Sequence, residues 1–558
     1  MMINRLFDEH EIRPVQSLDG MWQFEALDEK TEVSEMPVPG AWETDPNLAS
    51  YRGRALYTRE FSASGNVRIV FEGVSHTCEV SLDGKKLGSH YGAYGAFGFV
   101  AKDLAEGPHT LTVLADNRFH EHSALHISND YYSYGGITRP ARVEALGDAY
   151  LRGMHIVTVK KDGVWQAQAE LTVKSLAETA ETYELSLSLA GAEARTEIRL
   201  GAGEEKTVFR KLSCPQAENY CLMGDPDGRP VLYFAKAVLS RDGQAVDDLR
   251  DRIGFREVKV SGKDILFNGK KIRIKGFNRH EDYAEFGCAV PLQAMARDIA
   301  LMKQCGANAV RTCHYPNDPR FLDLCDENGM LVWTEAHARG LSEEQMRHPD
   351  FDREEELTIR EMVDQDFNHP SIFVWGLLNE CASHTAYGVA LYKKYIDLIH
   401  SLDASRPVSY ASCHFDDDLG LGLEDFVSYN IYPRWYKDEP VADNLKAQKA
   451  YINSAGGGGK PLIITEIGAG AIYGFRSETM DKWSEDYQAQ ALREQLETVM
   501  SDPDVTGCFI WQFADVRIAA GNRWFSSRPK SQNNKGVVDM YRRKKLSFPV
   551  VSEIFHRF

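Results

Sequence analysis

Beyond Gly262 the sequence alternates between short apolar runs and amphipathic stretches, and this rhythm constrains the fold more than any other feature. Eight apolar runs are typical of buried parallel strands, and they begin near residues 273, 307, 330, 372, 407, 426, 461 and 506. Helical patterns such as PLQAMARDIALMKQCG and PRFLDLCDENG lie between them, each ending in a glycine that stops a helix. Eight alternating units in about 300 residues predict one C-terminal (β/α)8 TIM barrel.

The first half of the chain has a different, all-β rhythm. Up to about residue 145, stretches such as VRIVFEGV and HTLTVLAD alternate in polarity and are separated by turn residues, which predicts a jelly-roll β-sandwich. From about 149 to 256 a second set of such stretches has the length of an immunoglobulin-like sandwich. We therefore predict a multidomain protein with boundaries at 1–147, 148–257 and 258–558.

Composition limits the partners and the compartment. The net charge of −18 argues against nucleic acid, so an acidic substrate would need a local cationic pocket. The ten cysteines are scattered and form no CxxC pair, which favours reduced thiols in a cytosolic protein. The start MMINRLFDEHEIRPV is unlike a signal peptide, and no eighteen apolar residues run together. We expect a cytoplasmic protein that binds neither nucleic acid nor a membrane.

Two glutamates stand where apolar runs give way to polar sequence. Glu380 ends SIFVWGLLNE after the fourth predicted strand, and Glu466 lies in PLIITEIG at the end of the seventh. A lone glutamate there would more often be a helix cap or a surface ion pair. Two of them on the catalytic rim of one barrel suggest glycoside hydrolysis, in which one carboxyl group protonates the leaving oxygen and the other attacks the anomeric carbon or activates water.

Five barrel motifs carry a family resemblance: NRHED (278–282), RTCHYP (311–316), NHPSIFVWGLLNE (368–380), IITEIG (463–468) and IWQFAD (510–515). Together with the order of the three predicted domains, they resemble glycoside hydrolase family 2 over almost the whole chain. The resemblance implies a retaining β-glycosidase with Glu380 as acid/base and Glu466 as nucleophile. It also implies that Asn379 bonds the sugar 2-hydroxyl, against the alternative of a backbone cap at the strand end.

The segment SQNNKGVVD follows the eighth predicted strand and contains Asn533-x-Lys535. It resembles the N-x-K signature with which β-glucuronidases hold the sugar carboxylate, for which lysine supplies a charge and asparagine a directional donor. The same group implies further sugar contacts at Asp130, His280, His314, Tyr432, Tyr436 and Trp511. Core packing is the alternative for these aromatic and histidine residues.

The chain also departs from the glucuronidase pattern. Where those enzymes have a sequence close to D-E-T-A, this chain has TEAHAR, so His337 and Arg339 could place new donors near the sugar O4 or its carboxylate. Alternatively, Arg339 could pair with an acid on the following helix. The arginine four residues before the N-x-K asparagine is replaced by Pro529, and the neighbouring Arg528 or Lys530 could substitute. The short stretch 340–355 predicts an open entrance.

We conclude from the sequence that the protein is an exo-β-hexuronidase that needs no cofactor or metal, with β-D-glucuronidase favoured over β-D-galacturonidase. The family's habits suggest a homo-oligomer. Two alternatives stay open: a β-galactosidase of the same family, and an inactive carbohydrate-binding protein, since fold alone does not fix function. The galactosidase branch binds Mg²⁺ and Na⁺ and has a longer C-terminal half, and a neutral sugar would leave Lys535 unpaired.

Overall fold

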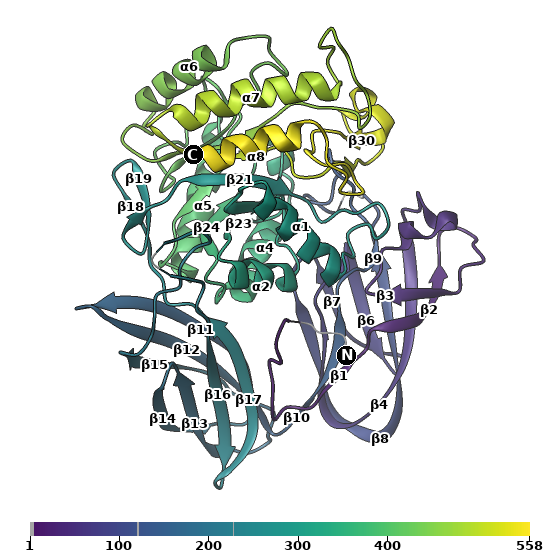
Figure 1. Ribbon diagram of the computed structural model, residues 1–558. Coiled ribbons are helices and arrows are strands. Elements are labelled where there is room, and N and C mark those ends of the chain that lie inside the picture. Colours follow the sequence, from purple (N-terminus) through teal and green to yellow (C-terminus); the bar gives the residue numbers. More distant parts are fainter. Residues whose placement is uncertain (1–4, 120–121, 227) are drawn as a thin grey trace.

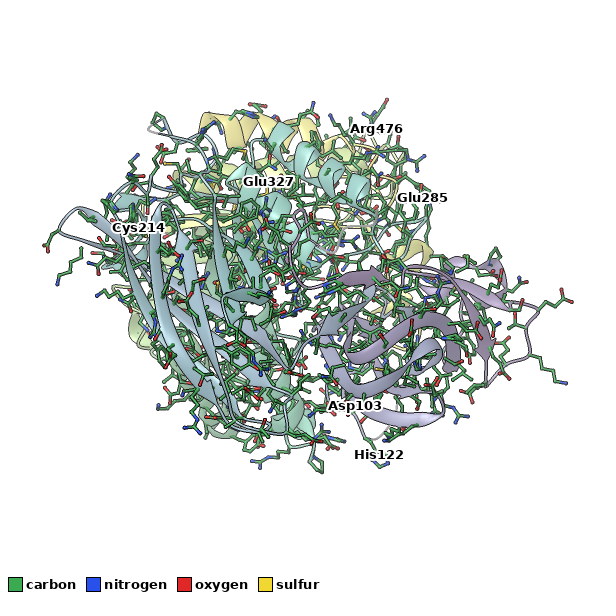
Figure 2. All side chains as sticks on the ribbon, turned by 90° about the horizontal axis from the view of Figure 1, so that it is seen from below. Asp103, His122, Cys214, Glu285, Glu327 and Arg476 are labelled. Atoms are coloured by element: carbon green, nitrogen blue, oxygen red, sulfur yellow. The ribbon has the colours of Figure 1, made fainter. Side chains whose placement is uncertain are left out.

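The computed structural model describes residues 5–119, 122–226 and 228–558 of the chain. Two β-sandwiches lie below a barrel, and the C-terminus ends beside the barrel (Figure 1). Seen from below, the two sandwiches stand next to each other (Figure 2). No helix among the described residues is both long and apolar enough to cross a membrane.

The first sandwich is built on an antiparallel sheet with the order β1-β10-β4-β8-β6-β7, to which β2 and β3 are added along β4. The long strands β4 and β8 change register near Gly65, and their alternating inward side chains form one apolar core. The strands are β1 (Val15–Ser17), β2 (Gly20–Ala26), β3 (Glu35–Val38), β4 (Arg54–Phe71), β6 (Thr77–Leu82), β7 (Lys85–Tyr91), β8 (Phe97–Asp116) and β10 (Ala141–Leu146), with the separate pair β5 (Val74–Ser75) and β9 (Gly136–Ile137).

The second sandwich packs a three-stranded sheet on a four-stranded one, as in immunoglobulin-like domains. The first sheet has the order β11 (Ala149–Lys161), β12 (Val164–Ser175), β15 (Glu205–Cys214), and the second β14 (Ala192–Leu200), β13 (Glu181–Leu189), β16 (Tyr233–Arg241), β17 (Gln244–Ile253). Alternate residues such as Leu185 and Leu187 fill the space between them. We propose domain limits at 147/148 and 257/258, as predicted from the sequence.

Eight parallel strands form the barrel, in the order β25-β24-β23-β22-β21-β28-β27-β26. Ser412 closes the ring, because its N–H donates to Ser428 and its carbonyl accepts from Asn430. All eight strands predicted from the sequence are confirmed: β21 (Ile274–Arg279), β22 (Ala309–Thr312), β23 (Leu331–Glu335), β24 (Ile372–Leu377), β25 (Val408–Tyr410), β26 (Val427–Asn430), β27 (Leu462–Ile467) and β28 (Val505–Ile510).

A small sheet of β18 (Val258–Ser261), β19 (Asp264–Phe267) and β20 (Lys270–Lys271) precedes the barrel. Its side chains Ile265 and Phe267 share a core with Trp333 and Phe509 of the barrel strands, so this sheet packs against the barrel interior. The other end of the barrel, where the strands finish, is therefore the end available for a site.

Helices follow the barrel strands and end as the sequence predicts. Asp318 caps the start of helix α2, because its side chain accepts from the Arg320 N–H, and Gly329, with a φ of +64°, caps its end. Gly306, with a φ of +83°, follows α1 in the same way. The helices are α1 (Leu292–Gln304), α2 (Pro319–Asn328), α3 (Glu343–Met346), α4 (Phe351–Asp366), α5 (Ala386–Leu402), α6 (Val441–Ser454), α7 (Glu485–Ser501) and α8 (Ser547–Arg557).

The jelly-roll sandwich is fixed to the barrel rim by buried polar contacts. Arg139 donates to the Glu281 carboxylate at 2.9 Å and to the Pro316 carbonyl at 2.7 Å, and the Tyr134 hydroxyl donates to Asp282 at 2.9 Å. Both anchors belong to the segment that contains Asp130. A sandwich loop is thereby held at the carboxyl ends of the barrel strands.

Candidate active site

Both predicted catalytic glutamates line one pocket of about 230 Å³ at the carboxyl ends of the strands. Glu380 lies just after β24 with a φ of +52°, a backbone conformation that L-residues rarely adopt and that proteins keep mainly at functional sites. Its N–H donates to the Ala411 carbonyl at 2.8 Å, which holds this turn. Glu466 lies within β27 beside a break in register with β28. Such irregularities re-aim side chains, here toward the barrel mouth.

Glu466 is held by two donors. Its Oε1 accepts from Arg311 Nη1 at 3.1 Å, and its Oε2 accepts from the Tyr432 hydroxyl at 2.5 Å. Burial and then the neighbouring Glu380 charge raise the pKa of Glu466 to about 7, while Arg311, Tyr432 and Arg339 act in the opposite direction. The carboxylate is thus fixed in one orientation and is ionised above neutral pH, as a nucleophile requires.

Glu380 has a more open environment. Its side chain is 17% exposed against 5% for Glu466, and its Oε1 accepts from Asn430 Nδ2 at 3.0 Å. Arg339 Nη2 lies 3.7 Å from the other oxygen. A carboxyl group that must exchange protons with a leaving group and then with water needs this access.

Arg311 connects the two catalytic strands and was given no role by the sequence analysis. Its Nη2 donates to Asn379 Oδ1 at 2.7 Å, and its Nε donates to Glu335 Oε2 at 2.8 Å. Arg311 and Glu335 are both fully buried. The signal in the sequence was a charged residue inside each of two apolar strands, since buried charges are rare unless paired. The shared contact orients Asn379 and Glu466 together.

The N-x-K segment faces the same pocket as the glutamates. Asn533 ends the short strand β30 (Gln532–Asn533) and donates from Nδ2 to Asp130 Oδ2 at 3.0 Å. Lys535 Nζ lies 5.3 Å from the Tyr436 ring centroid and forms no ion pair with any carboxylate in the described parts of the chain. Arg528 neutralises Asp130, with Nη2 and Oδ2 2.5 Å apart. Lys535, Arg528 and Asp130 together therefore carry one positive charge, which could bind an anion.

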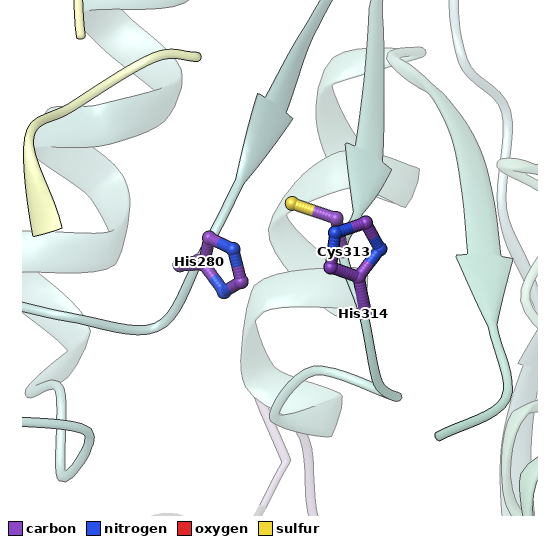
Figure 3. A group of neighbouring side chains, drawn as sticks. All are labelled: His280, Cys313 and His314. Carbon is purple, nitrogen blue, oxygen red and sulfur yellow. The ribbon is translucent and has the colours of Figure 1, made fainter. Parts of the chain in front are cut away.

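His280 and His314 follow the first two barrel strands, and Figure 3 shows them together with Cys313 at the ends of these strands. His314 Nδ1 is bonded to Glu335 Oε1 at 2.8 Å, and its ring stacks on Trp511 at 5.2 Å. His280 Nδ1 is 3.1 Å from the Tyr315 hydroxyl. Burial lowers the pKa of both histidines well below the usual value, so both are neutral at working pH.

These two histidines and Cys313 also form a possible soft-metal donor set. One atom from each, all within 4.8 Å of one another, could ligate an ion such as Zn²⁺. A second group within the same distance limit, Asp323 and Asp326 of α2 with His369, has mainly carboxylate donors, and Asp323 is already paired with Arg5. Neither group includes Glu380 or Glu466.

Several of the predicted sugar-binding residues present a buried polar atom that has no partner among the described residues. Buried polar groups are normally bonded, and exceptions point to a missing ligand or a functional role. The atoms are His280 Nε2, His314 Nε2, Arg339 Nε, Asn379 Nδ2 and Asn533 Oδ1. Sites of this kind match a ligand with many hydroxyl groups.

Six of the residues predicted to bind substrate are not among those that line the pocket: His280, His314, His337, Asn379, Lys530 and Asn533. The first two pack on the lining residue Trp511, and Asn379 and Asn533 bond to the lining residues Asn430 and Asp130.

His337 Nε2 is bonded to the Tyr131 hydroxyl at 3.0 Å, its ring packs against Tyr94, and burial lowers its pKa to about 4. His337 therefore packs with Tyr131 and Tyr94 and does not line the pocket. Lys530 is exposed in a turn, whereas Arg528, the other candidate cation, lines the pocket. Arg339 also lines it and contacts Asn129 Oδ1 at 3.1 Å rather than an acid of the following helix.

Residues 258–539 match the TIM barrel domain model of glycosyl hydrolases family 2, which is more than half of the chain. The chain belongs to glycoside hydrolase family 2. It is therefore a glycoside hydrolase by family, as its motifs indicated. It is 25% identical to a β-glucuronidase of Paenibacillus borealis, with 96% of each chain covered. It is 27% identical to a putative β-glucuronidase of Formosa agariphila, over 92% of this chain and 66% of that relative.

Two solved structures are similar to this chain over almost its whole length. A family 2 β-galacturonidase from Eisenbergiella tayi, solved bound to galacturonate, is 49% identical with a TM-score of 0.97, covering 100% of this chain and 99% of that one. A Bifidobacterium dentium β-glucuronidase, complexed with coumarin-3-O-glucuronide, is 25% identical with a TM-score of 0.86, covering 98% of both chains. The predicted family and three-part fold are confirmed.

Proposed function

We propose that this protein is a retaining exo-β-hexuronidase, which removes a terminal β-linked uronic acid from a conjugate or oligosaccharide. The observation that carries this proposal is Lys535, which has no carboxylate partner among the described residues and lies in the pocket that also contains Glu380 and Glu466. A buried cation without a counter-ion is costly, and the carboxylate of a uronic acid would supply that counter-ion. Relatives named β-glucuronidase and β-galacturonidase support the same substrate class.

The geometry supports a two-step reaction. Glu466 attacks the anomeric carbon and forms an ester with it, the bond to the leaving oxygen breaks, and the proton of Glu380 passes to that oxygen. Glu380, now ionised, takes a proton from water, whose oxygen attacks the same carbon and releases Glu466. Asn379 is fixed by Arg311, and its buried Nδ2 has no partner among the described residues, so this donor would bond the sugar 2-hydroxyl.

For the sugar itself we favour galacturonate over glucuronate, which reverses the order favoured by the sequence alone. The 49% identity to the Eisenbergiella tayi β-galacturonidase supports this choice, against about 25% for the β-glucuronidases. The two uronic acids differ only in the orientation of the C4 hydroxyl. We propose that Arg339 binds that hydroxyl and so distinguishes the two sugars. It lies between Glu380 and Asn129, and its buried Nε has no partner among the described residues.

The direct test is kcat/KM on the p-nitrophenyl β-glycosides of galacturonate, glucuronate and galactose, measured side by side with and without EDTA. We expect both uronides to exceed the galactoside, with the galacturonide highest and EDTA without effect. Preference for the galactoside would overturn the carboxylate site while leaving the two-glutamate chemistry intact. Ligand binding without hydrolysis of any of them would identify an inactive carbohydrate-binding protein.

We also propose a cytoplasmic location and a homo-oligomeric state. None of the ten cysteines forms a disulfide among the residues that the structure describes, which suits a reducing compartment. The oligomeric state rests on the family's habits. Light scattering coupled to gel filtration would measure it, and a monomeric mass would contradict the proposal.

A further inference from the structure

The mouth of the pocket is lined by residues that the sugar-binding assignment does not use. Phe415 and Trp524 line it together with Lys437 and Arg523. Lys437 Nζ lies over the Phe415 ring at 4.9 Å, and the Arg523 guanidinium lies over the Trp524 ring at 5.1 Å. Each aromatic ring therefore holds a cation in a fixed place at the mouth.

These two cations have no carboxylate partner among the residues that the structure describes. Both side chains are exposed, so each can meet a ligand as it enters. One acid, Glu439, shares the mouth, and its Oε1 already accepts from Asn444 Nδ2 at 2.7 Å. These three lining residues, Lys437, Arg523 and Glu439, together carry one positive charge, on a protein whose total charge is −18.

The position of Phe415 indicates which part of the substrate meets this mouth. The loop that carries Phe415 begins at Ala411, whose carbonyl accepts from the Glu380 N–H, and its His414 Nε2 lies 3.2 Å from the carbonyl of Cys381, the residue after Glu380. Because the acid/base donates its proton to the leaving oxygen, groups on its side of the pocket face the leaving group. Lys437, over the Phe415 ring, faces the same side.

We propose that the mouth is a leaving-group subsite for a second acidic sugar, so that the natural substrate is an oligosaccharide with a uronate next to the terminal one. This rests on the proposed hexuronidase function. An acidic oligosaccharide that approaches a protein of charge −18 needs a local cation at each of its two uronates. Lys535 can pair with the terminal uronate only. A neutral, drug-like leaving group would make no use of Lys437 and Arg523.

The test compares two disaccharides that share one terminal uronic acid and one linkage, where the second sugar is either a uronate or its carboxyl-reduced, neutral form. We expect kcat/KM for the acidic disaccharide to exceed that for the neutral one roughly fivefold in the wild type, the scale of partly exposed ion pairs, and the ratio to fall with added salt. Lys437→Gln with Arg523→Gln should bring the ratio to about one.

Lys446→Gln is the matched control, because Lys446 is exposed on the neighbouring helix α6 and lies outside the pocket lining. It should keep the wild-type ratio. Equal rates on the two disaccharides in the wild type, with p-nitrophenyl uronides still hydrolysed, would overturn the subsite and leave the proposed function standing. A wild type that hydrolyses no uronide would overturn the proposed function itself.

Discussion

The guanidinium of Arg528 and the carboxylate of Asp130 form a buried ion pair, with Nη2 and Oδ2 2.5 Å apart, across 398 positions of sequence. Asp130 comes from a loop of the jelly-roll sandwich and Arg528 from the segment after the last barrel strand. Asn533 joins the same carboxylate. The sandwich therefore completes the wall that we propose holds the sugar carboxylate, and the barrel alone would lack this part of the pocket.

Breaking the Asp130–Arg528 pair should lower both stability and activity, and the effects of substituting the two residues should not add. Asp130→Asn leaves the Arg528 charge unpaired at a site only 4% exposed, so we expect a loss of about 3 kcal/mol in unfolding free energy and a fall in kcat/KM. In a double-mutant cycle with Arg528→Gln, the second substitution should add little to the first. Urea denaturation and uronide kinetics measure both, and simple additivity would show that the two side chains do not depend on each other.

Glu466→Ala should lower turnover of every uronide by at least roughly a thousandfold, because the step that forms the glycosyl ester loses its nucleophile. The protein should remain folded, since the substitution removes a carboxylate whose own burial is unfavourable. Circular dichroism and kcat measure the two effects. Wild-type turnover in this variant would remove Glu466 from the mechanism.

Lys535→Ala should discriminate between sugars. We expect kcat/KM on uronides to fall roughly a hundredfold, the scale of a lost buried charge pair, while the slow hydrolysis of a neutral galactoside stays close to its starting value. The ratio of the two rates is the useful quantity, because a folding defect would lower both. An equal loss on both substrates would contradict the carboxylate clamp.

The pH dependence should report the ionisation of Glu466. With a pKa of about 7 in the free enzyme, kcat/KM should fall as the pH drops below about 7, because protonation removes the nucleophile. Tyr432→Phe removes a hydrogen bond that lowers this pKa, so the acid limb should move up by about one pH unit. Arg311 and Glu380 remain in place and keep their opposing effects. An acid limb unchanged in Tyr432→Phe would assign it to another group.

The barrel and its two glutamates could be predicted because both depend on local patterns. Eight apolar runs fix eight strands, and strand ends fix the rim on which Glu380 and Glu466 lie. Contacts between distant segments could not be predicted in the same way. Nothing local to Arg528 or Lys530 tells which of the two reaches Asp130, because that choice depends on how the 516–533 segment turns back over the barrel.

The same limit explains His337. Its place beside Arg339 in TEAHAR made the two residues equal candidates for the sugar, since a loop sequence does not reveal which side chain faces the pocket. The structure turns His337 toward Tyr131 and Tyr94 and leaves Arg339 in the lining. Arg311 is the opposite case, a residue with a role at the site that the sequence analysis did not assign. It bonds both Glu466 and Asn379, and no sequence motif predicts these contacts.

Arg339→Met should change the choice between epimers. The substitution keeps an unbranched side chain but removes the donors near Glu380, so the ratio of kcat/KM for the galacturonide to that for the glucuronide should fall about tenfold, the scale of one hydrogen bond to a charged group. His337→Phe is the matched control from the same loop, and it should keep the wild-type ratio because His337 packs behind the lining. If His337→Phe changed the ratio and Arg339→Met did not, the aromatic residues around Tyr131, and not Arg339, would determine the preference at C4.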